Sequence, residues 1–208
     1  IKNGEDLAFN QQDIIELNLV EDIFSLCMTG TIVFYDKVGY TEIREITGSD
    51  LVGVTYIEED IKIEKLFFIY DFHKIENEAQ LTSSVINSTT WFLVETHFPF
   101  LTNKRYSKSW GTGIKGNVIV KDILKNMVNI TTFANFEDTN ETFDNFYMPY
   151  WTPSEAINWI KQRCSGAQSQ LPGYLLYSNK NGFNFTTLDS LIKSPIREKN
   201  IDGSLTKY

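Results

Sequence analysis

The sequence is poor in cysteine and histidine, the residues on which many metal sites and nucleophilic active sites depend. Its 208 residues contain two of each. Cys27 and Cys164 lie far apart in apolar surroundings, without a second cysteine or a histidine at metal-ligand spacing. We therefore expect no zinc site and interpret both as small buried side chains, with a single long-range disulfide as the alternative. His73 and His97 belong to no HxxxH pair and lie near no serine elbow, so no catalytic residue, metal or cofactor is predicted.

The chain also lacks a long hydrophobic run. No stretch of 18 apolar residues occurs, so we expect no transmembrane helix and no membrane partner. No signal peptide is visible. Because the sequence starts at Ile1 rather than at methionine and stops at Tyr208 without a closing element, we expect it to be the front part of a longer protein.

An excess of positive charge is absent as well. The formal net charge is −8, and such a surface repels the phosphates of nucleic acids, which argues against general DNA or RNA binding. The solubility that a net charge gives a protein explains the acidic balance on its own.

Aromatic residues, in contrast, are abundant. They make up 14% of the chain, with 15 Phe and 10 Tyr. Flat rings suit a pleated, half-buried surface and favour β structure, but they are also enriched in the cores of protein interfaces. Composition alone leaves both explanations open.

The first hundred residues have the pattern of successive strands. Branched and aromatic residues gather in five segments separated by short turns: residues 14–20, 30–36, 51–58, 61–75 and 84–95. This arrangement predicts an antiparallel barrel or sandwich.

The pattern changes after Pro99. Asn117 is expected to cap a helix with one apolar face, and Thr152, Pro153 and Glu155 form a capping box with proline at the first helical position. Residues 174–185 predict a β-hairpin that turns at Asn181. We therefore predict an α+β fold, with an antiparallel β-barrel domain over residues 1–103 and a smaller α/β domain over residues 104–208.

Two motifs are typical of functional sites but have simpler explanations. Gly111–Gly116 matches GxGxxG, but the preceding residues are no buried strand, so we interpret the segment as a flexible glycine loop. Glu58, Glu59 and Asp60 form an acidic run, which would serve a glycosidase only as part of a pair of carboxylates. A solvated turn explains this run more simply.

Six segments together carry a family likeness. The blocks Val20–Ser25, Met28–Asp36 and Ile46–Leu51 resemble the opening of the baseplate hub proteins of tailed phages. Three later blocks follow in the order of that family: Lys104–Ser109 with Ile119–Leu124, then Met148–Ile160, then Gly173–Tyr177 with Gly182–Leu188. The chain departs from the family pattern at Ser25–Cys27, where the family has a proline, and at Ser178, where it has a glutamate.

The resemblance implies a non-enzymatic virion protein: a homotrimeric hub with a tube-type β-barrel domain. Family hubs form a ring that continues the tail tube and receives the central spike, so the implied partners are further copies of the chain, the tail tube protein, the spike and other baseplate proteins. DNA would pass through the ring without specific binding, and an acidic lumen would suit that passage.

Subunit contacts are expected at edge-strand and loop positions, namely Glu58, Glu59, Asp60, Trp110 and Tyr150. A carbohydrate-binding or adhesive β-domain of a phage tail is the alternative, because Tyr and Trp rings stack on sugars. A tail-associated glycan hydrolase would need two carboxylates in one cleft.

Overall fold

The structure is a computed structural model that describes residues 11–37, 39, 48–58, 60–77, 86–167, 169–194, 197–199 and 205–207. The chain divides into two compact units after Phe100, and the segment Tyr177–Gly182 groups with the first unit. The domain limits expected from the sequence, after residue 103, stay a prediction.

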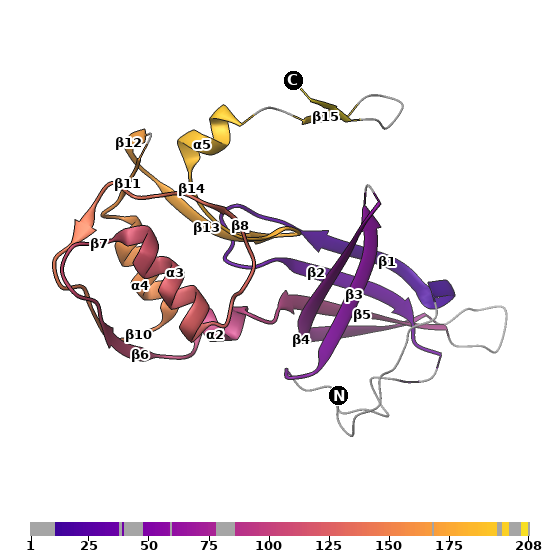
Figure 1. The fold of residues 1–208 in the computed structure, drawn as a ribbon. Coiled ribbons are helices and arrows are strands. Elements are labelled where there is room, and N and C mark those ends of the chain that lie inside the picture. Colours follow the sequence, from indigo (N-terminus) through magenta and orange to yellow (C-terminus); the bar gives the residue numbers. More distant parts are fainter. Residues whose placement is uncertain are drawn as a thin grey trace. The chain divides into compact units, whose positions relative to one another are not determined.

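The first unit is built on one five-stranded antiparallel sheet with the strand order β1-β2-β5-β4-β3 (Figure 1). Its strands are β1 (Ile14–Val20), β2 (Thr29–Tyr35), β3 (Leu51–Glu58), β4 (Ile61–Asn77) and β5 (Ile86–Glu95), and the short helix η1 (Gln11–Asp13) precedes them. The sheet curls into a half-barrel, and within the described residues no strand pairs with the outer side of β1 or of β3. All five predicted strands are confirmed, and so is the α+β class.

One face of the curled sheet holds the core of the first unit. Alternate residues of each strand point inward, which is why β2 alternates between buried and partly exposed positions. The core comprises Met28, Ile32, Phe34, Val52, Val54, Phe67, Ile69, Trp91 and Leu93. Full burial of each large side chain contributes about 1.5–3 kcal/mol. At Gly30 the strands β1 and β2 approach closely, since a Cβ there would lie 2.8 Å from the backbone oxygen of Asn18.

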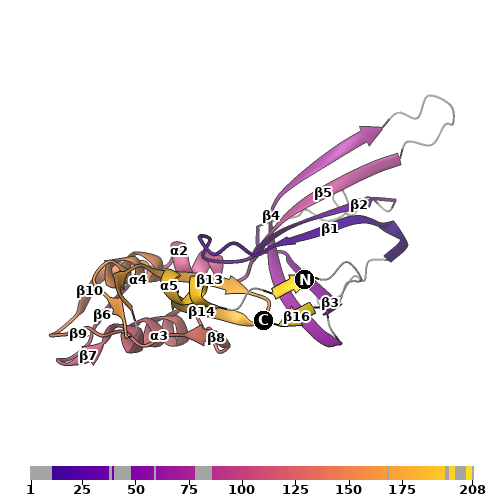
Figure 2. The ribbon, with the colours of Figure 1, turned by 90° about the horizontal axis from the view of Figure 1, so that it is seen from above.

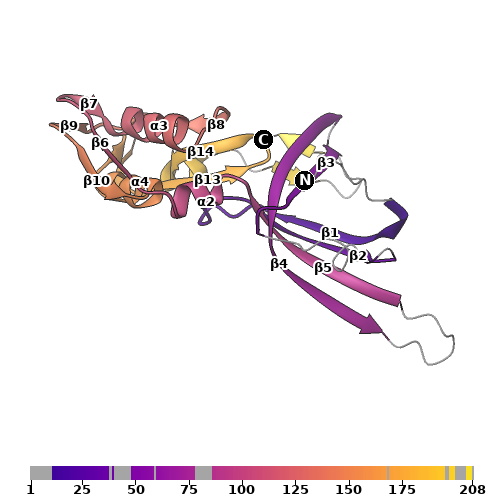
Figure 3. The same cartoon turned by 90° about the horizontal axis from the view of Figure 1, so that it is seen from below.

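Strand β4 is longer than its neighbour β3. β3 pairs with β4 only as far as Phe68, whereas β4 stays paired with β5 as far as Asn77. The register shifts by one residue between Ile69 and Asp71, the signature of a β-bulge, which bends a strand and increases its twist. Figures 2 and 3 show the ends of β4 and β5 leaving the other strands as a protruding pair.

The second unit combines helices with short strands. Its helices are α3 (Gly116–Met127), α4 (Pro153–Lys161) and α5 (Leu188–Lys193), and α2 (Phe98–Thr102) leads into it. Its strands are β6 (Tyr106–Ser109), β7 (Ile114–Lys115), β8 (Phe133–Phe136), β9 (Thr142–Phe143), β10 (Tyr147–Trp151), β11 (Ser165–Gly166), β12 (Ser169–Pro172), β13 (Tyr174–Asn179), β14 (Gly182–Thr187), β15 (Arg197–Lys199) and β16 (Leu205–Lys207).

Both predicted helices and the predicted hairpin are confirmed, but the expected cap of the first helix is wrong. α3 begins at Gly116 with Lys115 at the N-cap position and no side-chain cap, and the Asn117 amide group bonds Asp138 instead. The apolar face of α3 is buried at Ile119, Val120, Ile123 and Leu124. The hairpin β13–β14 gains a third strand, because β14 pairs in parallel with β8. Cys27 and Cys164 are free and buried, as their apolar surroundings indicate. Burial raises the pKa of the Cys164 thiol to about 11, since the thiolate loses its hydration.

Candidate interaction surfaces

The two edges of the five-stranded sheet expose apolar side chains beside unpaired backbone groups. Edge strand β1 presents Ile15, Leu17 and Val20, of which Ile15 is 48% exposed. Edge strand β3 presents Leu51 and Ile57, and Ile57 is 75% exposed. Neither strand contains a proline or a lysine, the residues that commonly protect a sheet edge from pairing. Within the described residues, neither edge strand is paired on its outer side.

The acidic turn between β3 and β4 lies at the end of one of these edges. Glu58 forms an ion pair with Lys180, with 2.7 Å between Oε1 and Nζ. Asp60 is exposed and has a φ of 64°, a conformation that Asp tolerates better than most residues. Glu59 lies outside the described residues. The side chains of Glu58 and Asp60 are exposed to solvent at the end of edge strand β3.

The turn after β1 presents an aromatic side chain that the sequence analysis missed. Phe24 is 77% exposed, the highest exposure of any large apolar residue in the described chain. The carboxylate of Asp22 accepts a hydrogen bond from the Phe24 amide at 2.9 Å, and the Asp22 carbonyl accepts one from the Ser25 amide at 3.0 Å. The turn is therefore held by its own hydrogen bonds while the ring faces solvent.

A buried charged group lies at the end of the same sheet. Glu95 is 4% exposed, accepts a hydrogen bond from the Met28 amide and lies 3.3 Å from Lys65 Nζ. Lys65 also donates to the carbonyl of Asn179 at 2.9 Å, and both residues belong to the first unit. Burial lowers the pKa of His97, and the positive charge of Lys65 lowers it as well. The carboxylate of Glu95 acts in the opposite direction and raises it. We interpret this group as structural, because Lys65 and His97 both lie within ion-pair distance of Glu95.

Trp110 belongs to the interior of the second unit. It is 8% exposed, and its indole Nε1 donates to Asp122 at 2.9 Å. The contact with another subunit expected for Trp110 stays a prediction, and little of the ring is available for it.

Tyr150 is displayed on a bulge. The register between β10 and β6 shifts between Met148 and Trp151, and Tyr150 adopts a φ of 50°, which is unusual for a bulky residue. Its amide donates to Ser107 Oγ at 3.1 Å, and its carbonyl accepts from Arg105 at 3.3 Å. The side chain is 66% exposed, and Tyr147 on the same strand is 58% exposed. The bulge therefore turns an aromatic ring towards solvent at a position expected to contact a subunit.

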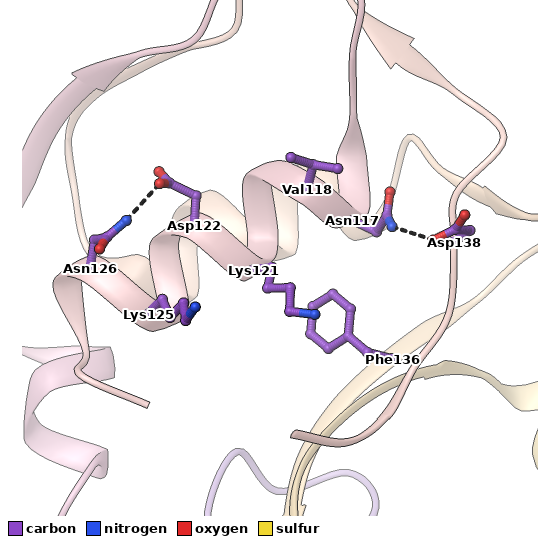
Figure 4. Close-up of a pocket in the computed structure, with 8 residues that line it drawn as sticks. All are labelled: Asn117, Val118, Lys121, Asp122, Lys125, Asn126, Phe136 and Asp138. Atoms are coloured by element: carbon purple, nitrogen blue, oxygen red, sulfur yellow. Dashed lines mark hydrogen bonds between the residues drawn. The ribbon is translucent and has the colours of Figure 1, made fainter. Parts of the chain in front are cut away.

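A shallow hollow runs along the outer face of α3 (Figure 4). Its lining consists of Asn117, Val118, Lys121, Asp122, Lys125, Asn126, Phe136 and Asp138. The ammonium of Lys121 lies 5.3 Å from the ring centre of Phe133 and 5.4 Å from that of Phe136, within the range of a cation–π contact.

The carboxylates that line this hollow are already engaged. Asp122 accepts from Lys108 at 2.6 Å, from Asn126 at 2.7 Å and from Trp110. Burial raises the pKa of Asp122, but these hydrogen bonds outweigh burial and hold the pKa below its usual range. Asp138 accepts from Asn117 at 2.7 Å and lies 3.5 Å from Lys115.

Two general features can be stated for the described part of the chain. No group of three or more His, Cys, Asp or Glu side chains is placed to hold a metal ion. None of its helices is long and apolar enough to cross a membrane.

Comparison with solved structures finds two tail proteins of similar fold. The chain is similar to the 43 kDa tail protein of prophage MuSo2 from Shewanella oneidensis, with a TM-score of 0.51 and 12% identity over 82% of this chain and 49% of that one. It is also similar to a tail protein from Neisseria meningitidis MC58, with a TM-score of 0.54 and 9% identity over 86% of this chain and 48% of that one. The chain shares their fold.

The likeness covers most of this chain but only about half the length of either tail protein. No family model matches the sequence, and no curated protein matches it.

Proposed function

We propose that this chain is a non-enzymatic structural subunit of a phage tail, a hub protein that assembles as a homotrimeric ring between the tail tube and the baseplate. Its partners are further copies of itself, the tail tube protein, the central spike and other baseplate proteins. Its place is the virion, after synthesis in the host cytoplasm.

The open edges of the sheet carry this proposal. β1 and β3 lie at opposite sides of the sheet order and both expose branched side chains. An exposed apolar edge strand favours pairing with another chain. When one copy offers one edge and the next copy offers the other, the contact is head-to-tail, and head-to-tail contacts close into rings when the rotation between subunits allows it. The fold shared with two tail proteins supports the same conclusion.

The charge supports the proposed passage of DNA. A net charge of −8 disfavours adhesion of the phosphate backbone. A channel through which DNA passes requires such weak adhesion. The ring would therefore line the channel without binding DNA specifically.

Replacement of an exposed edge residue by lysine tests the proposal. Ile15→Lys on β1 and Ile57→Lys on β3 place a charge where a neighbouring strand would pair. We expect each variant to sediment as a smaller species than the wild-type chain but to keep its circular dichroism spectrum, because both positions are exposed. Ile192→Lys is the matched control, since Ile192 is 74% exposed on α5 of the second unit. Unchanged assembly in both edge variants would contradict the proposal.

A carbohydrate-binding or adhesive role is the second candidate, and the display of Tyr147 and Tyr150 favours it. Two exposed rings on one strand offer a surface on which sugar rings stack. Binding to a glycan array that is lost in Tyr150→Ala and retained in Tyr150→Phe would favour this role. A wild-type chain that binds no glycan would exclude it.

A further inference from the structure

The hollow on α3 presents two lysines, Lys121 and Lys125, that form no ion pair within the described residues. Lys121 and Lys125 are exposed and lie one helical turn apart, where like charges destabilise a helix by a few tenths of a kcal/mol. Within the described residues neither forms an ion pair, because Asp122 and Asp138, the carboxylates of the hollow, are engaged by Lys108 and Lys115. In a chain with a net charge of −8, such a pair of lysines favours an acidic partner.

The hollow also has apolar walls. Val118 at the start of α3 is 51% exposed, and the ring of Phe136 lies beneath the ammonium of Lys121 (Figure 4). Aromatic and aliphatic walls with charges at the rim are the composition of a protein-binding site that accepts one large side chain. The occupant that fits is therefore an apolar side chain flanked by carboxylates.

The turn after β1 has this composition. Phe24 is the most exposed large apolar residue of the described chain, and Glu21 and Asp22 precede it. Within the described residues neither carboxylate forms an ion pair: Glu21 accepts from the amide of Lys180, and Asp22 from the amide of Phe24. Because the turn is already held by hydrogen bonds, little conformational entropy is lost when the ring is buried.

We propose that Phe24 of one copy of this chain docks in the α3 hollow of a second copy, with Glu21 and Asp22 facing Lys121 and Lys125. The contact joins two different surfaces, as a head-to-tail ring requires. The inference rests on the proposed ring and adds a specific anchor to it. The sheet edges and this anchor are separate contacts and can be tested separately.

Truncation of the anchor is the first test. Phe24→Ala removes an exposed ring, so folding is unaffected, and we expect self-association measured by sedimentation velocity to weaken about 30-fold, as for a central interface aromatic. Ile192→Ala is the matched control, because Ile192 is 74% exposed on α5 and lies outside the hollow. It should associate like the wild-type chain.

Exchange of charges is the second test. Lys125→Glu and Glu21→Lys should each weaken self-association about fivefold, and the double variant should recover the wild-type value, because the charges then face each other in reversed order. Lys193→Glu changes the net charge by the same amount as Lys125→Glu, at an exposed position on α5. It should leave self-association unchanged.

The outcomes separate the two proposals. A wild-type ring that is unaffected by Phe24→Ala and by the charge exchange overturns the anchor and leaves the ring. A wild-type chain that stays monomeric overturns both. The single charge variants could instead lower thermal stability, with the double variant restoring it, while the mass in solution of all three equals that of the wild-type protein. In that case Phe24 docks within its own chain and the inference is wrong.

Discussion

The indole of Trp110 donates a hydrogen bond to the carboxylate of Asp122, with 2.9 Å between Nε1 and Oδ2. The same oxygen accepts a hydrogen bond from Lys108 at 2.6 Å, and the other carboxylate oxygen accepts one from Asn126. One carboxylate thus joins strand β6, the residue that follows it and helix α3.

Replacement of this carboxylate should loosen the second unit. Asp122→Ala leaves the Trp110 indole N–H without its acceptor and removes the partner of Lys108. We expect the free energy of unfolding to fall by about 1–2 kcal/mol, less than for a fully buried site because Asp122 is partly exposed. Urea unfolding followed by tryptophan fluorescence measures this change. Asp189→Ala, which removes an exposed pair with Lys193 on α5, is the control and should unfold like the wild-type chain.

A second prediction concerns the start of α3. A Cβ on Gly116 would lie 2.6 Å from the sulfur of Cys164 and 3.2 Å from side-chain atoms of Ile160 and Phe143. Gly116→Ala gains about 1 kcal/mol in helix propensity, but overpacking costs about 1–3 kcal/mol, so we expect net destabilisation. In a Cys164→Ala background the cost should shrink, since the nearest atom is gone. An equal cost in both backgrounds, measured by thermal unfolding, would contradict this account.

The glycine motif shows what sequence reasoning misses here. The pattern of Gly111–Gly116 predicts a flexible loop, yet Gly116 is buried at the start of a helix and packs on Cys164. The close approach involves a residue far along the chain, which no local pattern reveals. Phe24 and the hollow on α3 were missed for the same reason, because exposure and the engagement of carboxylates depend on tertiary contacts. The five strands were predictable, since their alternation is local.

The capping box of α4 is the opposite case, because its two reciprocal hydrogen bonds lie within four residues. The Glu155 amide donates to Thr152 Oγ1 at 3.2 Å, and the Thr152 amide donates to Glu155 Oε2 at 2.7 Å, as the sequence predicted. Thr152→Ala should lower the free energy of unfolding by about 1 kcal/mol. Thr152→Ser should lower it much less, because the serine hydroxyl still caps the helix. Circular dichroism during thermal unfolding compares the two. A serine variant as unstable as the alanine variant would rule out capping as the cause.

Acid should destabilise the second unit through two carboxylates. Glu141 accepts from the amide and the hydroxyl of Ser165 at 2.7 and 2.6 Å, and Glu137 accepts from the amide and the hydroxyl of Thr187. Burial raises the pKa of each carboxylate, but hydrogen bonds outweigh burial and leave the pKa lowered. These bonds come from Ser190, Thr186 and Thr187 at Glu137 and from Ser165 at Glu141.

The sign of the pH dependence follows from the lowered pKa values. The stabilisation is fully present above the unfolded pKa of about 4.3 and is lost as pH falls through the lower folded pKa. Urea midpoints should therefore be constant above about pH 5 and fall below about pH 4. Trp110, Trp151 and Trp159 report on this unit by fluorescence. Glu141→Gln should flatten the dependence, and an unchanged slope in that variant would contradict the assignment.

The mass of the wild-type chain in solution tests the central claim most directly. Light scattering coupled to size-exclusion chromatography, at low micromolar concentration, should give about three times the 24.0 kDa of one chain. That value would support a ring closed through the open edges β1 and β3. A mass of 24.0 kDa at every concentration tested would contradict the proposed homotrimer.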